Sequence, residues 1–275
     1  MISILLRILL VLIVGYLGIV LFLYLKQDKI VYYPFKKMEQ LPSDLQLHYS
    51  DVYFKSSDGL NLNGWIVGDE NLSKVVLFCH GNGGNISYNL HFPSIYNKLG
   101  FRVFLFDYRG YGKSEGIPTE EGTYRDVEAA WYYLTQTLGI SPANIIILGH
   151  SLGGAIAARL TFTLEIKPRA LILESTFTSV PDLGANLYPF LPVRLVSKYH
   201  YDTSSILPMV HLPVLVIHSR EDEIIPFSHG QKLFHLANQP KRFLEISGTH
   251  NEGTYTSGLT YTEGVKEFLN SLGMD

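Results

Sequence analysis

Cysteine is nearly absent from this chain of 275 residues, which has a single one, Cys79. One cysteine excludes an internal disulfide and any zinc site built from several cysteines. Because Cys79 follows the apolar run KVVLF, we expect it to be a buried structural thiol. Charged residues are also scarce, at 17%, and the net charge is −3. The chain therefore lacks the basic surface that is typical of proteins that bind nucleic acid.

One stretch lacks charge altogether, from Ile8 to Leu25, and reads ILLVLIVGYLGIVLFLYL. Its length is about that needed to span the hydrocarbon core of a bilayer. A cleavable signal peptide would be followed by a small-x-small motif, and a buried helix of a soluble protein would keep a polar face. Neither is present. We therefore predict an uncleaved membrane anchor over residues 1–27 and a juxtamembrane connector over residues 28–49.

The positive charges beside the anchor predict its orientation. Lys26, Lys29, Lys36 and Lys37 follow the apolar stretch, against Arg7 and the terminal amine before it. Because lysine and arginine favour the cytoplasmic side, we expect a single-pass protein whose main domain is cytoplasmic.

Beyond the connector, residues 50–275 alternate between apolar runs and helix-like segments. After two strands around the turn Ser57-Asp58-Gly59, six runs are typical of buried strands: KVVLFC, RVFLFD, NIIILG, RALILE, PVLVIHS and RFLEI. Helical patterns fall between most of them, at residues 87–99, 122–138, 152–164, 228–238 and 261–272. This alternation predicts an α/β domain with a mostly parallel central sheet and helices on both of its faces.

One segment, residues 175–212, interrupts this alternation. It is rich in aromatic residues and proline, and it is longer than an ordinary connection between two elements of an α/β domain. We expect it to form a small cap over a substrate pocket. The apolar side chains predicted to bind substrate there are Phe177, Leu187, Tyr188 and Phe190.

The motif Gly149-His150-Ser151-Leu152-Gly153 lies between a predicted strand and a predicted helix. In that context G-x-S-x-G marks a nucleophilic serine at a sharp turn. We expect the two glycines to let the turn close without Cβ clashes, because they can adopt backbone angles that other residues reach only with strain. A turn needed only for packing is the alternative explanation, so the remaining catalytic groups decide between the two.

A serine hydroxyl needs a base, and the base needs an orienting acid. Asp222 lies in the loop after the strand PVLVIHS, and His250 lies in the loop after RFLEI. Because the carboxyl ends of parallel strands share one edge of a sheet, we expect Ser151, Asp222 and His250 to come together. That chain order, serine then acid then histidine, is the order of the α/β hydrolases.

Other acids and histidines compete for these roles. Glu221 and Glu223 flank Asp222. His150 adjoins the serine, but we expect its side chain to point away from the hydroxyl. His218 ends a predicted strand, where a structural histidine is the simpler interpretation.

Acyl transfer also needs hydrogen-bond donors for the developing oxyanion. The backbone N–H of Leu152, directly after the serine, is one candidate. The second is the N–H of Asn82, in the loop HGNGGN after the strand KVVLFC. The stretch GYGKSEG is not a phosphate-binding loop, because Asp107 stands where that motif requires glycine. Since the chain also lacks metal-ligand spacings, we expect no metal and no cofactor.

Several ordered stretches together resemble serine hydrolases of the α/β-hydrolase superfamily: HGNGGN, DYRGYGKSEG, GHSLGGA, LESTFTS, YPFLPVRL, HSREDEIIP and GTHNE. The chain is most similar to the membrane-anchored family of α/β-hydrolase domain-containing protein 13 and its fungal and bacterial relatives. The resemblance covers nearly the whole chain after the anchor. It implies an α/β-hydrolase fold and favours Asp222 over its neighbours, because Asp222 occupies the acid's position in the family's loop. The residues to which it assigns roles are the triad Ser151, Asp222 and His250, the oxyanion donors Leu152 and Asn82, and Asp107 and Arg109 as structural support.

Related hydrolases include lipid esterases and protein depalmitoylases, so the resemblance implies an acyl ester or thioester as substrate, cleaved through an acyl-enzyme. Two other functions stay open. A serine aminopeptidase-like hydrolase would need a carboxylate in the cap to hold the substrate's amine, for which Asp182 and Asp202 are available. A non-catalytic, membrane-tethered scaffold on the same fold would usually have lost one of the three catalytic residues.

Overall fold

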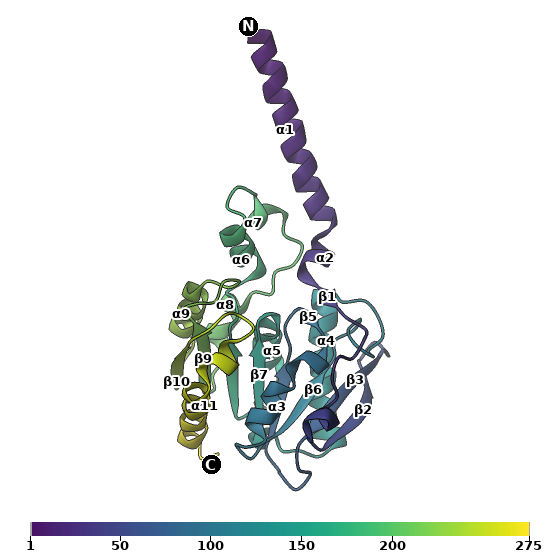
Figure 1. The fold of residues 1–275 in the computed structure, drawn as a ribbon, viewed down its shortest axis with the longest axis vertical. Coiled ribbons are helices and arrows are strands. Elements are labelled where there is room, and N and C mark those ends of the chain that lie inside the picture. The colour runs from purple at the N-terminus through teal and green to yellow at the C-terminus, as the bar shows by residue number, and fades with distance from the viewer. Residues whose placement is uncertain (1, 275) are drawn as a thin grey trace.

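The computed structural model describes residues 2–274, in which one long helix stands apart from a layered domain (Figure 1). This helix, α1 (Ile2–Leu25), contains a 22-residue apolar window, Ile4–Leu25, with a mean hydropathy of 2.9. None of the window is buried inside the protein, which excludes a core helix of a soluble domain. A short helix, α2 (Gln27–Val31), then leads to the domain.

Within residues 2–274, an eight-stranded sheet forms the middle layer of the domain, in the order β10-β9-β8-β7-β4-β6-β3-β2. β2 and β3 are antiparallel to their neighbours, and the other strands run parallel. The bounds are β2 (Tyr49–Lys55), β3 (Asn61–Val67), β4 (Val75–Cys79), β6 (Arg102–Phe106), β7 (Ile145–His150), β8 (Ala170–Glu174), β9 (Val214–Ser219) and β10 (Lys241–Ile246). The predicted strands and fold class are therefore confirmed.

Helices cover both faces of the sheet (Figure 1). The bounds are α3 (His91–Tyr96), α4 (Glu120–Tyr132), α5 (Leu152–Thr163), α9 (Phe227–Leu236), α10 (Gly253–Ser257) and α11 (Leu259–Ser271). Along β4, Val75, Leu77 and Cys79 join the core cluster of α4, α5 and α9, whereas Val76 and Phe78 join that of α3 and α11. Cys79 is fully buried, as expected. Both faces of β4 are apolar because both are covered.

All five helical predictions differ from the structure in their bounds by at least one residue, and two of the differences have a clear local cause. The predicted helix over residues 87–99 is a 3₁₀ turn, Ile86–Asn89, followed by the short α3. Pro93 accounts for the break, because proline fits the first turn of a helix and disrupts its interior. α4 begins at Glu120, before the predicted residue 122, because the Thr119 side chain caps it by accepting the Gly122 N–H.

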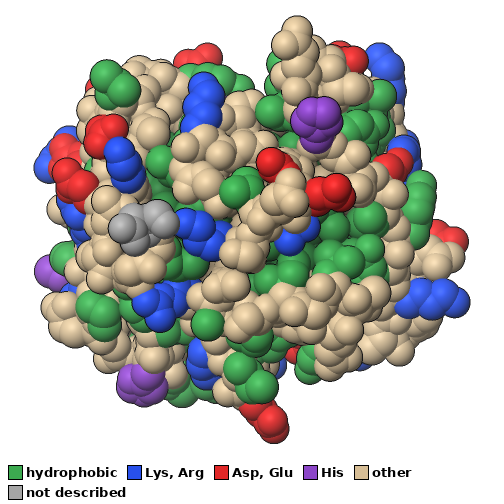
Figure 2. Space-filling view, turned by 90° about the horizontal axis from the view of Figure 1, so that it is seen from below, with side chains coloured by type: hydrophobic (Ala, Val, Ile, Leu, Met, Phe, Trp, Pro, Cys, Tyr) green, Lys and Arg blue, Asp and Glu red, His purple; other side chains and the backbone are tan. Residues whose placement is uncertain are grey.

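The connector and the cap meet at the end of the domain from which α1 leaves. The connector forms a second, two-stranded sheet, in which β1 (Tyr33–Pro34) runs parallel to β5 (Gly83–Gly84). The cap contains α6 (Val180–Leu187), α7 (Val193–Val196) and α8 (Thr203–Ile206), and α6 and α7 rise beside the base of α1 (Figure 1). On the face opposite to this end, basic and acidic side chains are interspersed, as on a surface that faces water (Figure 2).

Candidate active site

Ser151 occupies a strained turn between β7 and α5. Its backbone angles are φ 55° and ψ −121°, which a residue with a side chain rarely adopts. Two hydrogen bonds hold the turn: the Ser151 N–H donates to the Glu174 carbonyl at 3.0 Å, and Thr176 Oγ1 donates to the Ser151 carbonyl at 2.6 Å. Strain of this kind persists where the surroundings impose it, and it is characteristic of functional sites.

The two glycines of the motif allow the turn to close, but not through the backbone angles expected of them. The left-handed backbone angle belongs to Ser151 itself, while Gly149 and Gly153 are not among the residues with positive φ. They are needed for space. A Cβ on Gly153 would lie 2.0 Å from the Cys79 carbonyl oxygen, and one on Gly149 would lie 2.3 Å from that of Gly153. The predicted avoidance of Cβ clashes is therefore confirmed, but the reason is the close approach of α5 to the sheet and not the backbone angles of the glycines.

The sheet brings together the three residues singled out in the sequence. Ser151 Oγ lies 3.1 Å from His250 Nε2, and His250 Nδ1 lies 2.8 Å from Asp222 Oδ2. All three side chains are largely buried. Loops after three parallel strands, β7, β9 and β10, carry them, so they meet at one sheet edge although 99 residues separate serine from histidine. Distances of this size are those of a nucleophile, a base and an orienting acid.

The carboxylate of Asp222 is held from both sides. Its Oδ1 accepts the backbone N–H groups of Ile224 and Ile225, at 3.0 and 2.7 Å. Its Oδ2 faces His250, and His218 Nε2 lies 3.4 Å away. Burial alone would raise the pKa of Asp222, but the hydrogen bonds from the two histidines and the backbone together hold it below its usual range. His218, expected to be structural, thus also borders the acid.

The two glutamates that flank Asp222 bind backbone instead. Glu221 Oε2 accepts the N–H of Gly248 at 2.7 Å, and Glu223 Oε2 accepts the N–H of His250 at 3.0 Å. Both therefore fix the loop that carries the histidine rather than the histidine ring. This distribution leaves Asp222 as the carboxylate that meets the His250 side chain.

The predicted oxyanion loop lies directly against the serine. A Cβ built on Gly81 would lie 3.4 Å from the Ser151 Cβ, and Asn82 lines the same cavity as Ser151. Leu152 is the first residue of α5. His80 Nδ1 lies 2.7 Å from the Gly81 carbonyl, and burial lowers the pKa of His80 to about 4, which keeps the ring neutral.

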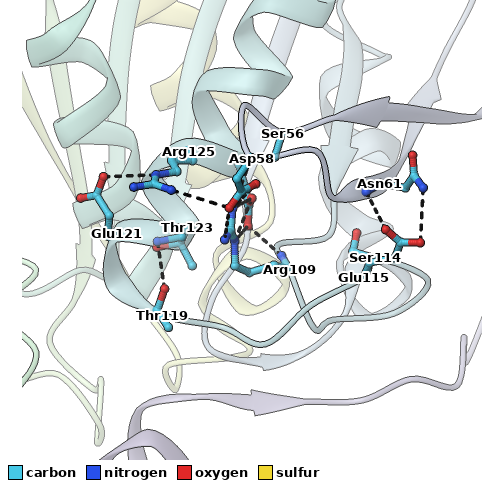
Figure 3. A network of polar contacts seen from close by, with 12 residues as sticks. Ser56, Asp58, Asn61, Arg109, Ser114, Glu115, Thr119, Glu121, Thr123 and Arg125 are labelled. Carbon is cyan, nitrogen blue, oxygen red and sulfur yellow. Dashed lines mark hydrogen bonds and ion pairs between the residues drawn. The ribbon is translucent and has the colours of Figure 1, made fainter.

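Asp107 and Arg109, expected to give structural support, make two separate sets of contacts. Asp107 Oδ1 accepts the N–H of Ile86, at the end of the oxyanion loop, at 2.9 Å. Arg109 binds Asp126 and Asp58, each at 2.8 Å, in the polar network of Figure 3. A guanidinium between two carboxylates fixes the loops that carry them.

A cavity of about 440 Å³ opens beside Ser151. Five of its lining residues lie outside the motifs found in the sequence: Phe35, Tyr88, Asn89, His91 and Thr254. His150 also lines it, and its ring lies 5.2 Å from that of His250, so its side chain faces the cavity. Burial lowers the pKa of His150 to about 3, so its ring is neutral. Among residues 2–274, no three His, Cys, Asp or Glu side chains are placed to hold a metal ion.

The predicted substrate-binding residues of the cap do not line this cavity. Phe177 is buried in the core, and Leu187, Tyr188 and Phe190 are exposed. Their contact with substrate therefore stays a prediction, and α6 lies beside the base of α1 (Figure 1). Tyr188 instead lines a groove of about 360 Å³ between the cap and the end of α1.

Buried Glu174, beneath the serine turn, predicts a measurable dependence of stability on pH. Tyr261 Oη and Thr254 Oγ1 donate to it, and burial raises its pKa to about 7. Between about pH 4.5 and 7 the folded state keeps a proton that the unfolded state loses, so stability falls as the pH rises, by about 3 kcal/mol.

We expect Glu174→Gln to remove this part of the pH dependence. The unfolding temperature of the variant, relative to wild type, should rise by about 5 to 10 °C between pH 4.5 and 8. Asp107, whose pKa burial raises to about 8, acts in the same direction and is unchanged in both proteins. Thermal unfolding in detergent across this range measures the difference. Parallel curves for the two proteins would show that Glu174 is ionised in the folded state.

Comparisons with known proteins agree with this geometry. The model of a family described as "alpha/beta hydrolase fold" matches residues 74–195. An uncharacterised protein of Mycobacterium tuberculosis is 34% identical over 255 residues, which cover 92% of this chain and 90% of the relative. The alpha/beta hydrolase domain-containing protein WAV2 of Arabidopsis thaliana is 34% identical, over 88% of this chain and 87% of its own.

A solved structure, that of the Pyrococcus furiosus esterase Pf2001, shares the fold. It superposes with a TM-score of 0.74 at 21% sequence identity, over 88% of this chain and 97% of its own. These findings confirm the resemblance stated from the sequence motifs.

Proposed function

Because this chain belongs to the α/β-hydrolase family, we propose that it is a membrane-anchored serine hydrolase of carboxylic esters or thioesters with lipid-like acyl groups. The observation that carries the proposal is the continuous chain of contacts from Ser151 through His250 to Asp222, at 3.1 and 2.8 Å. The strained turn at Ser151 and the cavity beside it support the same conclusion.

In this proposal the reaction proceeds through an acyl-enzyme. His250 Nε2 takes the proton of Ser151 Oγ while that oxygen attacks the acyl carbonyl carbon. The backbone N–H groups of Leu152 and Asn82 stabilise the oxyanion, and His250 returns the proton to the departing alcohol or thiol. Water, deprotonated by His250, then attacks the acyl-enzyme, and Ser151 leaves with the proton as the acid is released. Asp222 holds the imidazole tautomer and stabilises its charged form.

The position of the cap supports a substrate that comes from the membrane. Tyr16, nine residues before the end of α1, donates a hydrogen bond from its hydroxyl to the Phe190 carbonyl at 2.9 Å. That distance along the helix is about 13 Å. Phe190 and Leu195 are 71% and 87% exposed. Apolar side chains at this depth are stabilised by lipid, and the Tyr16 bond satisfies a carbonyl that would otherwise lie unpaired there.

Basic groups lie where the lipid headgroups would be. The Lys198 ammonium stacks over the Tyr24 ring at 4.2 Å, and the Gln27 side chain binds the Val196 carbonyl and the Lys198 N–H, both at 2.7 Å. Aromatic and basic residues favour this interfacial level. With the four lysines after α1, they support an uncleaved anchor and a cytoplasmic domain.

We therefore expect Phe190→Trp to report contact with lipid. The two native tryptophans, Trp65 and Trp131, are buried and give a constant background. In vesicles of lipids brominated at defined depths, the new fluorescence should be quenched most by bromines near the headgroup end of the chain. Ile166→Trp is the matched control, because Ile166 is 69% exposed. It precedes the amino end of β8, whereas Ser151 lies at the carboxyl ends of the parallel strands. Equal quenching of both variants would place the cap in water.

The aminopeptidase-like alternative is disfavoured by the carboxylates of the cap. Asp182 is bound to Arg194 at 3.0 Å and lies 3.6 Å from Lys232. Asp202 caps α8, where its Oδ1 accepts from Ser205 N and Ser204 Oγ. Among the described residues, the lining of the cavity beside Ser151 includes no aspartate or glutamate. A free amine would therefore find no carboxylate there to pair with. The scaffold alternative is disfavoured because all three catalytic groups are present and in contact.

The full chain in lipid nanodiscs tests the proposal. We expect p-nitrophenyl esters to be cleaved with kcat/KM rising from acetyl toward longer acyl chains, because each buried methylene adds about 0.8 kcal/mol of binding. Aminoacyl p-nitroanilides should be cleaved at least about 100-fold less efficiently. Rapid cleavage of acetyl esters with no gain from longer chains would contradict a lipid-like substrate, and preference for the anilides would favour the peptidase.

A further inference from the structure

The connector that leaves the membrane anchor is hydrogen-bonded to the oxyanion loop. In the β1–β5 pairing, the Tyr33 N–H donates to the Asn82 carbonyl and the Phe35 N–H donates to the Gly84 carbonyl, both at 2.9 Å. The fully buried Asn85 returns the contact, because its side-chain amide donates to the Phe35 carbonyl at 3.0 Å and to the Lys37 carbonyl at 2.7 Å. Residues 33–37 thus form the outer wall of the loop.

The contacts from residues 33–37 are important because the oxyanion loop has few side chains of its own that could fix its conformation. Three of the four residues 81–84 are glycine, so they have no side chains with which to pack, and ordering glycine costs more backbone entropy than ordering other residues. Two consecutive peptide groups are nevertheless held. His80 Nδ1 lies 2.7 Å from the Gly81 carbonyl. The Asn82 carbonyl accepts both the Tyr33 N–H and, at 2.8 Å, the Tyr111 hydroxyl.

The Asn82 N–H belongs to the first of these peptides and is the proposed oxyanion donor. The Asn82 carbonyl belongs to the second, the peptide between Asn82 and Gly83. When both peptides are fixed, the backbone torsion angles of Asn82 between them are restricted, and so is the direction of its N–H. An oxyanion donor is effective only when it is aimed before the charge develops. The connector supplies one of the two hydrogen bonds that fix this carbonyl.

The other end of the connector is anchored as well. Tyr32 Oη lies 2.8 Å from Tyr201 Oη, which lies 2.9 Å from Thr123 Oγ1. Eight residues separate the end of α1 from Pro34, and Phe35 lines the cavity beside Ser151. The chain therefore runs directly from the membrane to the wall of the substrate cavity.

We propose that the juxtamembrane connector is a positioning element of the active site, which aims the Asn82 N–H at the oxyanion and forms one wall of the cavity with Phe35. The inference rests on the proposed hydrolase function. In this proposal the anchor does more than hold the protein at the membrane, because the strand that follows it helps to fix the Asn82 carbonyl in the oxyanion loop.

The test compares two substitutions at one position in the full chain. Tyr33→Pro deletes the N–H that binds Asn82, whereas Tyr33→Ala removes the side chain and keeps the N–H. Proline is compatible with the preceding residue, because Tyr32 is extended, at φ −117° and ψ 129°. Relative to Tyr33→Ala, we expect Tyr33→Pro to lower kcat for p-nitrophenyl acetate by about 10- to 100-fold, below the full effect of losing an oxyanion donor, with KM changed less than about threefold.

A second variant guards against a general folding defect. Tyr111→Phe removes the other hydrogen bond to the Asn82 carbonyl and keeps the Tyr33 N–H, and we expect a smaller loss of kcat, about three- to tenfold. Unfolding temperatures of all variants show whether the protein remains folded. Equal kcat for Tyr33→Pro and Tyr33→Ala, or a loss of kcat that matches the loss of folded protein, would overturn the proposal.

Amide hydrogen exchange separates this proposal from the proposed function. We expect exchange in residues 80–85 to be faster in Tyr33→Pro than in Tyr33→Ala, while exchange in β7 and β8 stays equal. This readout needs no substrate. Lack of ester cleavage by the wild type would overturn the hydrolase function alone, whereas equal exchange in the two variants would overturn the role of the connector.

Discussion

Replacement of Ser151 by alanine is expected to lower kcat for ester hydrolysis by about 10⁴- to 10⁶-fold, because the acyl-enzyme route is lost while binding and the oxyanion donors remain. The fold should tolerate the change, since the two hydrogen bonds that hold the turn use the backbone of residue 151. The measurement is steady-state hydrolysis of a p-nitrophenyl ester by the purified full chain, with the unfolding temperature recorded for each protein.

Ser228→Ala is the matched control, because Ser228 is an exposed serine in α9 outside the site. We expect it to retain wild-type kcat. A Ser151→Ala protein that is folded and keeps more than about a tenth of the wild-type kcat would show that another group is the nucleophile.

Asp222→Asn is expected to lower kcat by about 10³- to 10⁴-fold, and the structure indicates why. Asp222 Oδ1 accepts two backbone N–H groups, from Ile224 and Ile225, so the carbonyl oxygen of asparagine would take that position. Its NH₂ group would then face His250 Nδ1 and donate to it, which forces the proton onto Nε2. In that tautomer Nε2 cannot accept the proton of Ser151.

The flanking Glu223→Gln serves as a comparison for this variant. Glu223 binds the N–H of His250 rather than its ring, so its loss should lower kcat by less than about tenfold. Equal losses in the two variants would contradict the assignment of the acid.

Stability gives a second readout: because the pKa of Asp222 is lowered in the folded state, its stabilising contribution is present above about pH 4 and is lost as the pH falls. The difference in unfolding free energy between wild type and Asp222→Asn should therefore shrink below pH 4.

The sequence was sufficient for the sheet and for the contacts among Ser151, His250 and Asp222. Continuous apolar runs identify buried strands, and parallel strands place the residues that follow them at one edge whatever their separation along the chain. Local chemistry at this edge was harder to predict. The motif indicates that a Cβ at Gly153 would clash, but it does not identify the Cys79 carbonyl as the clashing group, because that depends on how closely α5 approaches β4.

Two features of the site could not have been predicted from the pattern. The pairing of Tyr33-Pro34 with Gly83-Gly84 involves strands of two residues, too short for any periodicity. The cap residues Leu187 and Phe190 are apolar, as expected of a pocket wall, but composition does not distinguish a side chain that faces a cavity from one that faces lipid. In the proposed function that distinction rests on α1, to which the cap is tied through Tyr16 and Gln27.

The central claim is that Ser151 is an activated nucleophile, and covalent labelling tests it most directly. The full chain in native membranes would be treated with a fluorophosphonate probe and digested, and the labelled residue would be identified by mass spectrometry. The account predicts a single adduct on Ser151, which is lost after heat unfolding and in His250→Ala, because activation requires the folded site and its base. An adduct on a different residue, or no adduct on protein shown to be folded, would contradict it.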